Sequence, residues 1–322
     1  MKEGVINIDK PAGWTSHDVV AKVRNILNVK KVGHTGTLDP DATGVLPVCF
    51  GKGTKVVSFL MNVEKEYDVV LRLGVETDTQ DAAGKVLRSC PVSSDVLEAV
   101  QGTLEGFVGS YAQTPPMYSA VKVKGRPLYE AARAGEVIER APRRVTLREI
   151  RFRKIEGSDV FFSVVCSKGT YIRTLCADIG VKLGVGGSLL RLRRTRSGNF
   201  RLTDSIEIEA FCRLYLEGGW EGQVYSLNEV LSDVPGVWVK ERFVRKIAHG
   251  APVGAEGILK RDFFEKGAAL RLLDDQGILL ALGTAKSGSN EIGTEKEERF
   301  FFKIETVLSE ADEPVKVGKI EI

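Results

Sequence analysis

The sequence has few of the side chains from which metal centres and disulfide frameworks are built. It contains three histidines and five cysteines in 322 residues, and no two cysteines form a Cys-x-x-Cys pair. An odd number of widely spaced cysteines indicates neither a disulfide framework nor a zinc site, so we expect no metal. Cys49 and Cys166 lie in apolar, strand-like runs, which predicts buried thiols in a reducing compartment.

Long apolar runs are also absent. No stretch approaches the roughly 18 apolar residues of a membrane span, and the start, Met-Lys-Glu-Gly-Val, lacks the apolar region of a signal peptide. The composition, with 43% hydrophobic and 28% charged residues, is that of an ordinary soluble globular protein. We therefore expect a cytoplasmic protein with no membrane partner, and a monomer, because nothing in the sequence suggests a dimer seam.

The net charge of +3 is small but unevenly distributed. Residues 140–201 contain fifteen Lys or Arg and four acidic residues, so this block carries +11 and the rest of the chain −8. A basic block beside acidic flanks indicates a polyanionic partner, most simply nucleic acid. Arginines that alternate outward on solvated strands would give the same pattern, and the charge alone does not separate the two interpretations.

Hydrophobic periodicity predicts alternating strands and helices, hence an α+β fold with a mixed sheet flanked by helices. The predicted strands are 4–9, 45–50, 67–73, 145–155, 159–167 and 188–197. The predicted helices are one that begins at Thr15 or Ser16 and others at 54–61, 95–104, 128–134, 170–183 and 207–216.

A second, smaller domain is predicted after the linker-like sequence Ser-Asp-Val-Pro-Gly at 232–236. The predicted domains are therefore 1–232 and 233–322. The second has predicted strands at 254–259, 268–273, 278–283 and 300–304, typical of a small β-barrel. The polar loop at 286–299 has no assignment.

Residues 33–44, Gly-His-Thr-Gly-Thr-Leu-Asp-Pro-Asp-Ala-Thr-Gly, contain three glycines and a proline, which exclude a regular helix or central strand. The stretch lies between a predicted helix and a buried strand, and a tight loop held by rigid neighbours is a common place for chemistry. It carries His34, Asp39 and Asp41, and Pro40 biases Asp39 toward an extended backbone. For an isolated Asp-Pro pair, a turn capped by its own aspartate would be the simpler interpretation.

This loop resembles the catalytic motif of the pseudouridine synthases, in the form found in bacterial tRNA pseudouridine-55 synthases. Further family blocks follow in collinear order over about the first two thirds of the chain. They are Asp-Lys-Pro at 9–11, Lys-Glu-Tyr at 65–67, Met-Tyr-Ser-Ala at 117–120, Ser-Lys-Gly-Thr-Tyr-Ile-Arg-Thr at 167–174 and Leu-Arg-Arg at 192–194. The resemblance implies the pseudouridine synthase fold followed by a C-terminal PUA-like RNA-binding domain, with residues 113–140 as a thumb-like segment that closes over RNA.

The resemblance also implies the reaction, which converts uridine 55 in the T loop of tRNA to pseudouridine. The N1–C1′ bond breaks and the base rejoins the ribose through C5. Because the redox state is unchanged and nothing is hydrolysed, no cofactor is expected.

The family pattern gives each matched residue a role. Asp39 would be the essential carboxylate, either as a nucleophile at C1′ or as a base at the 2′ position, and sequence does not choose between them. Arg173 would be its ion-pair partner. Tyr67 would form the aromatic wall under the flipped base and serve the C5 proton. The remaining matches are substrate-binding: Tyr171 and Leu192 at the uridine, His34 at the surrounding RNA, and Lys10 as a support near Tyr67.

Three alternatives remain at the level of sequence. A non-catalytic RNA-binding protein or tRNA chaperone would use the same basic block. A relative that works on guide RNA within a multi-protein particle would share the catalytic loop. A glycosidase would need a second catalytic carboxylate, and Asp41 is too close in sequence to Asp39 to be a convincing one.

Overall fold

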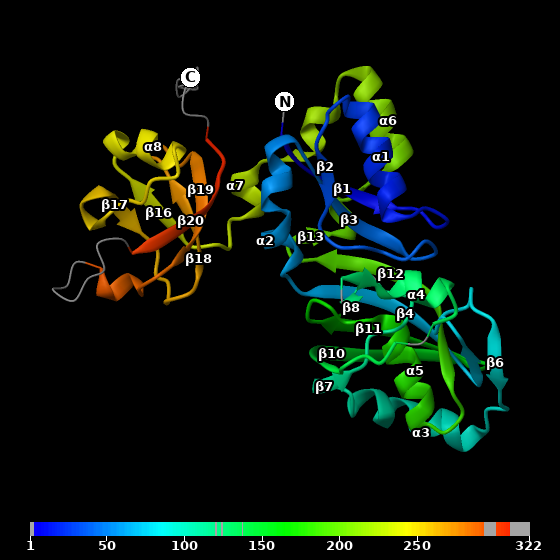
Figure 1. Cartoon of the computed structure of the whole chain (residues 1–322). Coiled ribbons are helices and arrows are strands. Elements are labelled where there is room, and N and C mark those ends of the chain that lie inside the picture. Colours follow the sequence, from blue (N-terminus) through cyan, green and yellow to red (C-terminus); the bar gives the residue numbers. More distant parts are fainter. Residues whose placement is uncertain (1–2, 120, 124, 137, 293–300, 310–322) are drawn as a thin grey trace.

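The computed structural model describes residues 3–119, 121–123, 125–136, 138–292 and 301–309 (Figure 1). Two large β-sheets organise these residues, one built from residues 4–225 and the other from residues 236–307. Helices flank the first sheet, whose strands pair in both parallel and antiparallel fashion, so the predicted α+β class with a mixed sheet is confirmed.

The first sheet contains eleven of the described strands, with the main path β14–β1–β3–β12–β4–β11–β10–β7. Its centre is β12, which is antiparallel to β4 and parallel to β3. The parallel contact pairs Arg193 with Thr43 and Arg194 with Gly44. The strands are β1 (Gly4–Lys10), β2 (Val32–His34), β3 (Thr43–Phe50), β4 (Lys65–Leu73), β7 (Gly109–Gln113), β10 (Arg143–Glu156), β11 (Asp159–Cys166), β12 (Gly187–Ser197), β13 (Phe200–Arg201), β14 (Ile206–Glu207) and β15 (Val224–Tyr225).

Four helices cover this sheet. Helix α1 (Ser16–Leu27) packs beside α6 (Ile208–Glu217) near β1 and β3, whereas α5 (Ile172–Lys182) packs on β12 and β4, and α3 (Ser94–Glu105) on β10 (Figure 1). The predicted start of the first helix is confirmed, because Thr15 is the N-cap and forms a capping box with Asp18. The apolar positions Val19, Val20 and Val23 face the core as expected.

Two local predictions were wrong. Residues 54–61 do not form one α-helix, because a 3₁₀ helix over Gly51–Val56 precedes the short α2 (Val57–Met61). Glycines and β-branched residues in this stretch lower its helix propensity. The structure also contains a hairpin, β5 (Val75–Thr77) and β6 (Val86–Ser89), that the sequence analysis did not predict.

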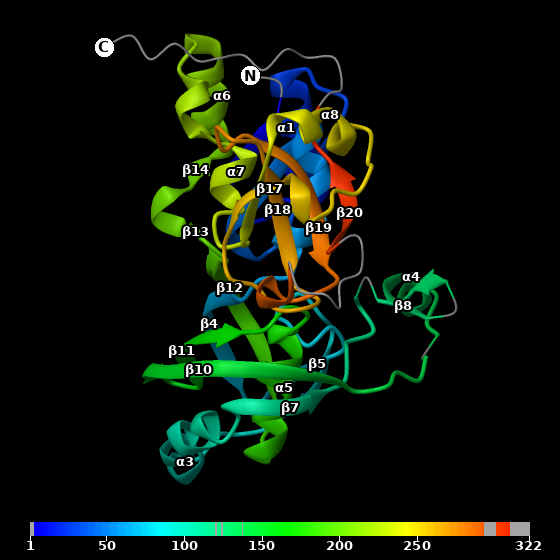
Figure 2. The same ribbon diagram turned by 90° about the vertical axis from the view of Figure 1, so that its left-hand side faces the viewer.

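The thumb segment, residues 113–140, leaves the sheet at the edge strand β7 and returns at β10. It contains a small hairpin of β8 (Lys122–Val123) and β9 (Arg126–Pro127), followed by α4 (Leu128–Arg133) close to the predicted helix. Figure 2 shows this hairpin and helix standing out from the body of the protein.

The C-terminal sheet has the order β17–β16–β18–β19–β20, and α8 (Glu241–Ala248) packs on β19 and β20. Its strands are β16 (Gly236–Val239), β17 (Ile258–Arg261), β18 (Ala269–Leu273), β19 (Leu279–Ala285) and β20 (Phe302–Val307). The strand predicted at 254–259 begins instead at Ile258, because Ala255–Gly257 form a 3₁₀ turn in which Gly257 lies against Val253 and Phe243. Phe300 and the second half of the loop at 286–299, residues 293–299, lie outside the described residues.

The two sheets meet through an apolar cluster that includes Val5 and Cys49 from the first and Leu282 and Leu308 from the second. The short α7 (Leu227–Val230) lies between them. We propose the division at 232/233 as the domain boundary.

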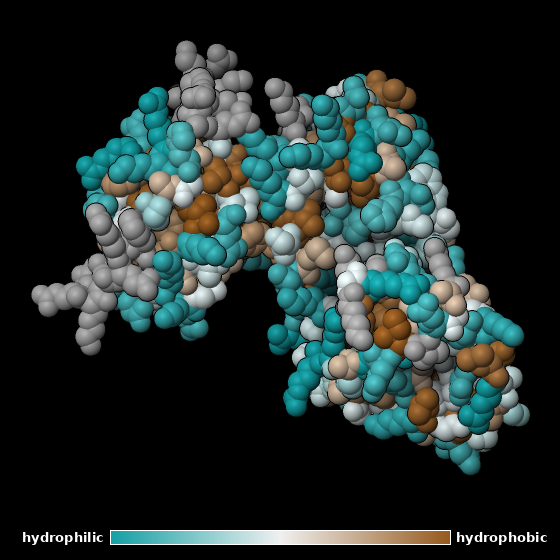
Figure 3. Space-filling view, in the orientation of Figure 1, coloured by the Kyte–Doolittle hydropathy of each residue, from teal (hydrophilic) through white to brown (hydrophobic). Residues whose placement is uncertain are grey.

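On the face seen in Figure 3, hydrophilic residues dominate the surface around the concave side between the two parts. In the described part of the chain, no helix is long and apolar enough to cross a membrane.

Candidate active site

The loop at residues 33–44 joins β2 to β3, and α1 fixes its conformation. The hydroxyl of Ser16 accepts a hydrogen bond from the Leu38 amide (2.9 Å) and donates one to the Leu38 carbonyl (3.2 Å). Leu38 is buried in the main core, which anchors the residue just before Asp39. The Asp39 carbonyl accepts a hydrogen bond from the Ala42 amide, closing a turn. Asp39 is therefore displayed from a fixed backbone.

Lys10, at the end of β1, clamps the other side of the same loop. Its buried ammonium group donates to the carbonyls of Pro11 (2.8 Å), Trp14 (2.5 Å) and Pro40 (2.9 Å). Burial lowers the pKa of Lys10 to about 8, although the charges of Asp41 and Asp39 oppose this decrease. Lys10 thus holds the carbonyl of Pro40, the residue that follows Asp39, and the predicted support near Tyr67 stays a prediction.

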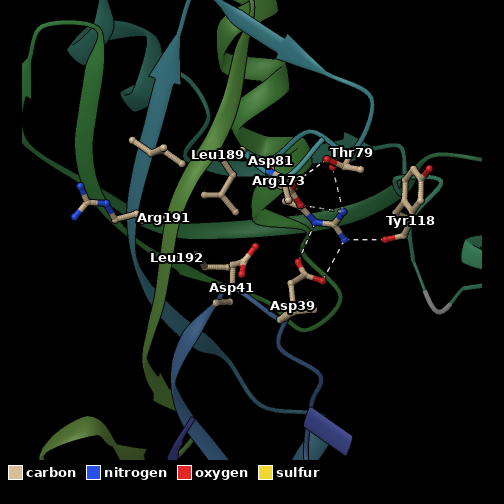
Figure 4. A pocket seen from close by; sticks show the side chains of 14 residues that line it. Asp39, Asp41, Thr79, Asp81, Tyr118, Arg173, Leu189, Arg191 and Leu192 are labelled. Atoms are coloured by element: carbon tan, nitrogen blue, oxygen red, sulfur yellow. Dashed lines mark hydrogen bonds and ion pairs between the residues drawn. The ribbon is translucent and has the colours of Figure 1, made fainter. Parts of the chain in front are cut away.

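Asp39 and Arg173 face one another, as the resemblance implied (Figure 4). Nε of Arg173 lies 2.9 Å from Oδ2 of Asp39, and Nη2 lies 3.3 Å from Oδ1, which is a two-point contact. The guanidinium also donates to the carbonyls of Thr79 (3.1 Å) and Tyr118 (2.7 Å). The Arg173 side chain is 7% exposed, whereas that of Asp39 is 42% exposed. The arginine is thus the fixed member of the pair and the carboxylate is the accessible one.

The pKa of Asp39 is raised above its ordinary value, chiefly because the surrounding protein removes water from the carboxylate. Arg173 opposes this increase, whereas the nearby negative charge of Asp81 adds to it. The ion pair and the burial therefore act in opposite directions on the same proton. This arrangement gives a more basic carboxylate than a solvated aspartate while Arg173 favours its ionised form.

A cavity of about 240 Å³ opens beside this pair. Leu192 and Leu189 of β12 form an apolar side of it, and Arg191 points away from Asp39 (Figure 4). The full set of lining residues is Asp39, Pro40, Asp41, Ala42, Thr79, Asp81, Ala82, Ala83, Tyr118, Arg173 and the four residues 189–192. Of the predicted site residues, the structure brings Asp39, Arg173 and Leu192 together in one cavity.

Tyr67 is not one of the residues that line this cavity. It is 8% exposed on β4 and lies opposite Arg194 of β12 in the sheet. Burial raises the pKa of Tyr67, Arg194 opposes the increase, and the charge of Asp39 adds to it. The charge of Asp39 therefore acts on the Tyr67 hydroxyl, although the tyrosine side chain is buried.

His34 and Tyr171 also lie outside the set that lines the cavity. Nδ1 of His34 accepts a hydrogen bond from the Gly36 amide (3.2 Å), and the ring packs edge-on against His17 at 5.7 Å. Burial lowers the pKa of His34 to about 4, so the imidazole is neutral at neutral pH. Tyr171 is the N-cap of α5, and its backbone is fixed by two hydrogen bonds to the Gln113 side chain.

Sequence reasoning missed the wall formed by the turn between β5 and β6. Asp81 lies 3.7 Å from Arg173, and it organises the turn by accepting hydrogen bonds from Thr79 and Ala83. The polar run Asp-Thr-Gln-Asp at 78–81 is a turn signal, but nothing local in it predicts a place beside Arg173.

The basic block of residues 140–201 is partly neutralised within the fold. Arg153 contacts Asp68 (2.6 Å), Arg193 contacts Asp9 (2.7 Å), and Arg196 contacts Glu66 (3.2 Å). Seven of the fifteen cations contact carboxylates: Arg148, Arg151, Arg153, Lys154, Arg173, Arg193 and Arg196. These pairs agree with the interpretation of arginines that lie on strands, and the polyanionic partner stays a prediction. Within the described ranges, no group of three or more His, Cys, Asp or Glu side chains could hold a metal ion.

Family models and known proteins match most of this chain. The model of the TruB family pseudouridylate synthase N-terminal domain matches residues 24–172, and that of the tRNA pseudouridylate synthase B C-terminal domain matches residues 173–234. A tRNA pseudouridine synthase B of Stutzerimonas stutzeri (strain A1501) is 43% identical over 283 residues, which cover 87% of this chain and 90% of the relative.

A second tRNA pseudouridine synthase B, from Clostridium perfringens (strain SM101 / Type A), is 41% identical over 308 residues, or 95% of this chain and 99% of the relative. Among solved structures, that of an H/ACA RNP bound to a substrate RNA containing 2′-deoxyuridine contains a chain that aligns with a TM-score of 0.75 and 32% identity. The alignment covers 96% of this chain and 86% of that one. These matches cover most of the chain, and the chain belongs to the TruB family of pseudouridylate synthases.

Proposed function

We propose that this protein isomerises uridine 55 in the T loop of tRNA to pseudouridine, with Asp39 as the essential catalytic group. The observation that carries the proposal is the contact of Asp39 with Arg173 at an open cavity, on a loop whose sequence resembles that of bacterial tRNA pseudouridine-55 synthases. The name shared by the curated relatives, tRNA pseudouridine synthase B, supports tRNA as the substrate.

Asp39 acts on the ribose in its ionised form. Its raised pKa makes the carboxylate more basic, and also a better nucleophile, than an aspartate in water, while Arg173 keeps it charged and oriented. Attack on C1′ and removal of the 2′ proton both use the same carboxylate, and the geometry is compatible with either route. Leu189 and Leu192 supply an apolar surface for the uracil ring while it turns.

Tyr67 accepts the proton from C5 of the base in the last stage of the reaction. Because its side chain is covered in this structure, the RNA has to be bound before the hydroxyl and the base can meet. Tyr171 contacts the uridine, and Lys10 keeps the loop in place. His34 contacts the surrounding RNA as a neutral ring, since its pKa of about 4 excludes a charge at neutral pH.

RNA binding uses surfaces beyond the cavity. The target base is stacked inside the T loop and must be flipped out, which costs a few kcal/mol. The thumb segment supplies contacts with the RNA beside the site. Its Tyr118 carbonyl accepts a hydrogen bond from Arg173, which places the segment at the edge of the cavity. The PUA-like domain adds affinity without chemistry. The protein acts as a monomer in the cytoplasm, the compartment in which its proposed substrate is found.

The test is conversion of an unmodified tRNA transcript by the purified protein alone, followed by carbodiimide labelling and nuclease digestion to locate pseudouridine. A transcript with cytidine at position 55 is the matched control. We expect pseudouridine at position 55 only in the first transcript and without added guide RNA. Pseudouridine at another position would refute the T-loop assignment, and conversion only in the presence of a guide RNA would favour the alternative of a relative that works on guide RNA within a multi-protein particle.

A further inference from the structure

Arg194 is the largest side chain that the fold buries completely, with an exposed fraction of 1%. Its Nε donates to the Val45 carbonyl (2.6 Å) and its Nη2 to the Gly36 carbonyl (3.0 Å). In the part of the chain that the structure describes, no carboxylate lies within 4.0 Å of this guanidinium. A buried cation without an anion is costly, so its presence calls for a compensating partner.

The partner that the fold offers is Tyr67. The antiparallel pairing of β4 and β12 places Tyr67 directly opposite Arg194. Because a guanidinium can only donate, the phenolic oxygen is the atom of Tyr67 that can accept from Arg194. In that arrangement the proton of the phenol points away from Arg194.

Further basic groups lie near Arg194. Lys10, His34 and Lys65 are close enough for the positive charge of Arg194 to lower the pKa of each. Burial raises the pKa of Tyr67, and Arg194 is the nearby cation that opposes this increase most. Tyr67 as phenolate would thus be the anion that this buried cation lacks.

The backbone around Arg194 leaves the guanidinium little freedom. Gly44 of β3 has a φ of +101°, and a Cβ atom there would lie 2.2 Å from the Arg194 carbonyl oxygen. Because glycine permits this close approach, β3 runs directly against the backbone of Arg194. One buried side chain thus binds the catalytic loop, through Gly36, and the strand β3, through Val45, and it does so from the position opposite Tyr67.

We propose that Arg194 is the positioning residue of the C5 proton-transfer step: it orients the Tyr67 hydroxyl and stabilises the phenolate that accepts the proton. The inference rests on the proposed function, in which Tyr67 serves C5. The hydroxyl proton of Tyr67 passes to solvent, and the phenolate then takes the proton from C5 of the rejoined base. The C5–H electron pair restores the C5–C6 double bond, the displaced electrons move to N1, and N1 takes a proton from solvent. One proton leaves and one returns, so Tyr67 ends in its starting form.

The test is single-turnover conversion at saturating enzyme of tRNA transcripts that carry hydrogen or deuterium at C5 of uridine. Arg194→Met keeps an unbranched apolar side chain but removes the cation, whereas Arg194→Lys keeps the charge. Arg196→Met is the matched control, since Arg196 lies two residues along β12 and pairs instead with Glu66. Thermal unfolding and tRNA binding are measured for each variant.

We expect Arg194→Met to slow conversion about a hundredfold, within the range that general acid–base groups contribute, about 10²- to 10⁴-fold. The ratio of the hydrogen and deuterium rates should rise above that of the wild type, because C5 proton transfer becomes the slow step. Arg194→Lys should recover about tenfold of the lost rate, since it restores the charge but not the fork. Arg196→Met should leave both the rate and the isotope ratio unchanged.

A double variant completes the test. In a Tyr67→Phe background there is no hydroxyl to position, so adding Arg194→Met should slow conversion no further. An Arg194→Met protein that is slow but keeps the wild-type isotope ratio would overturn the inference and leave Arg194 a structural residue. Multiplicative losses in the double variant would overturn it as well. If the wild-type protein made no pseudouridine, the proposed function itself would be refuted. If the wild type were active but Arg194→Met kept the wild-type isotope ratio, or the double variant showed multiplicative losses, only this inference would be refuted.

Discussion

Replacing Arg173 by lysine tests whether the shape of the cation matters as well as its charge. Arg173 contacts Asp39 at two points, 2.9 and 3.3 Å, and donates to two carbonyls at 3.1 and 2.7 Å. A lysine has one nitrogen and no planar fork, so it can keep one contact with Asp39 but not the whole set. The carboxylate would lose its fixed direction, and the Thr79 and Tyr118 carbonyls would lose a donor.

We expect Arg173→Lys to lower the single-turnover rate by about 10²- to 10³-fold, equal to about 3–4 kcal/mol of transition-state stabilisation. Part of this loss comes from the lost orientation of the carboxylate. The rest arises because lysine opposes the effect of burial less than arginine does, so the pKa of Asp39 rises further. The acid limb of the pH–rate profile should therefore move to higher pH in the variant.

The assay is single-turnover conversion of a tRNA transcript across a pH series. Arg72→Lys is the matched control, because Arg72 makes a two-point contact with Asp159, at 2.8 and 2.9 Å, away from the cavity. The control should keep the wild-type rate. If Arg173→Lys also stayed within a few-fold of the wild type, the fork would not orient Asp39 and the reasoning would be refuted.

Four further predictions follow from other features. Asp39→Asn should abolish pseudouridine formation while tRNA binding stays within about tenfold, or about 1.4 kcal/mol; a filter-binding assay in which binding and activity fall together would favour a structural role for Asp39. Lys10→Met should lower the rate and the thermal stability together, because three carbonyls lose their donor; an unchanged melting temperature would argue against the clamp. Hydrogen exchange over residues 113–140 should slow on addition of tRNA, and equal protection with and without tRNA would contradict the thumb assignment. Asp178→Asn should stabilise the protein at pH 8 by at most about 3 kcal/mol and have little effect at pH 4, because burial raises the folded-state pKa of Asp178 from 3.8 to about 6, so its ionisation costs stability above that pH; urea unfolding at both pH values measures this, and equal gains at both would point to a different cause.

The sequence predicted the elements whose signals are local. Thr15 and Asp18 mark the start of α1 through a capping box, and the glycines and proline of residues 33–44 keep the loop irregular. The contact of Asp39 with Arg173 joins residues 134 positions apart, and no local pattern contains it; the resemblance to a known family supplied it.

The features that the sequence did not predict depend on contacts between distant strands. The turn at Thr79 and Asp81 reaches the cavity because its backbone pairs with Leu189 of β12. The pairing of the basic block depends on where β1 and β4 lie, since Asp9, Glu66 and Asp68 come from those strands. The charge count along the chain therefore overstated the positive charge that the surface presents.

The pairing of these cations within the protein affects how strongly salt weakens RNA binding. A cation that binds RNA phosphates releases the counterions condensed on them, and each such contact makes binding more sensitive to salt. The seven cations already paired with carboxylates are poorly placed to contribute. Arg143, Arg144 and Arg191, which are exposed and have no carboxylate partner among the described residues, are better placed. Affinity for RNA should thus decline with salt less steeply than a block of fifteen cations would suggest, leaving shape and base contacts a larger share of recognition.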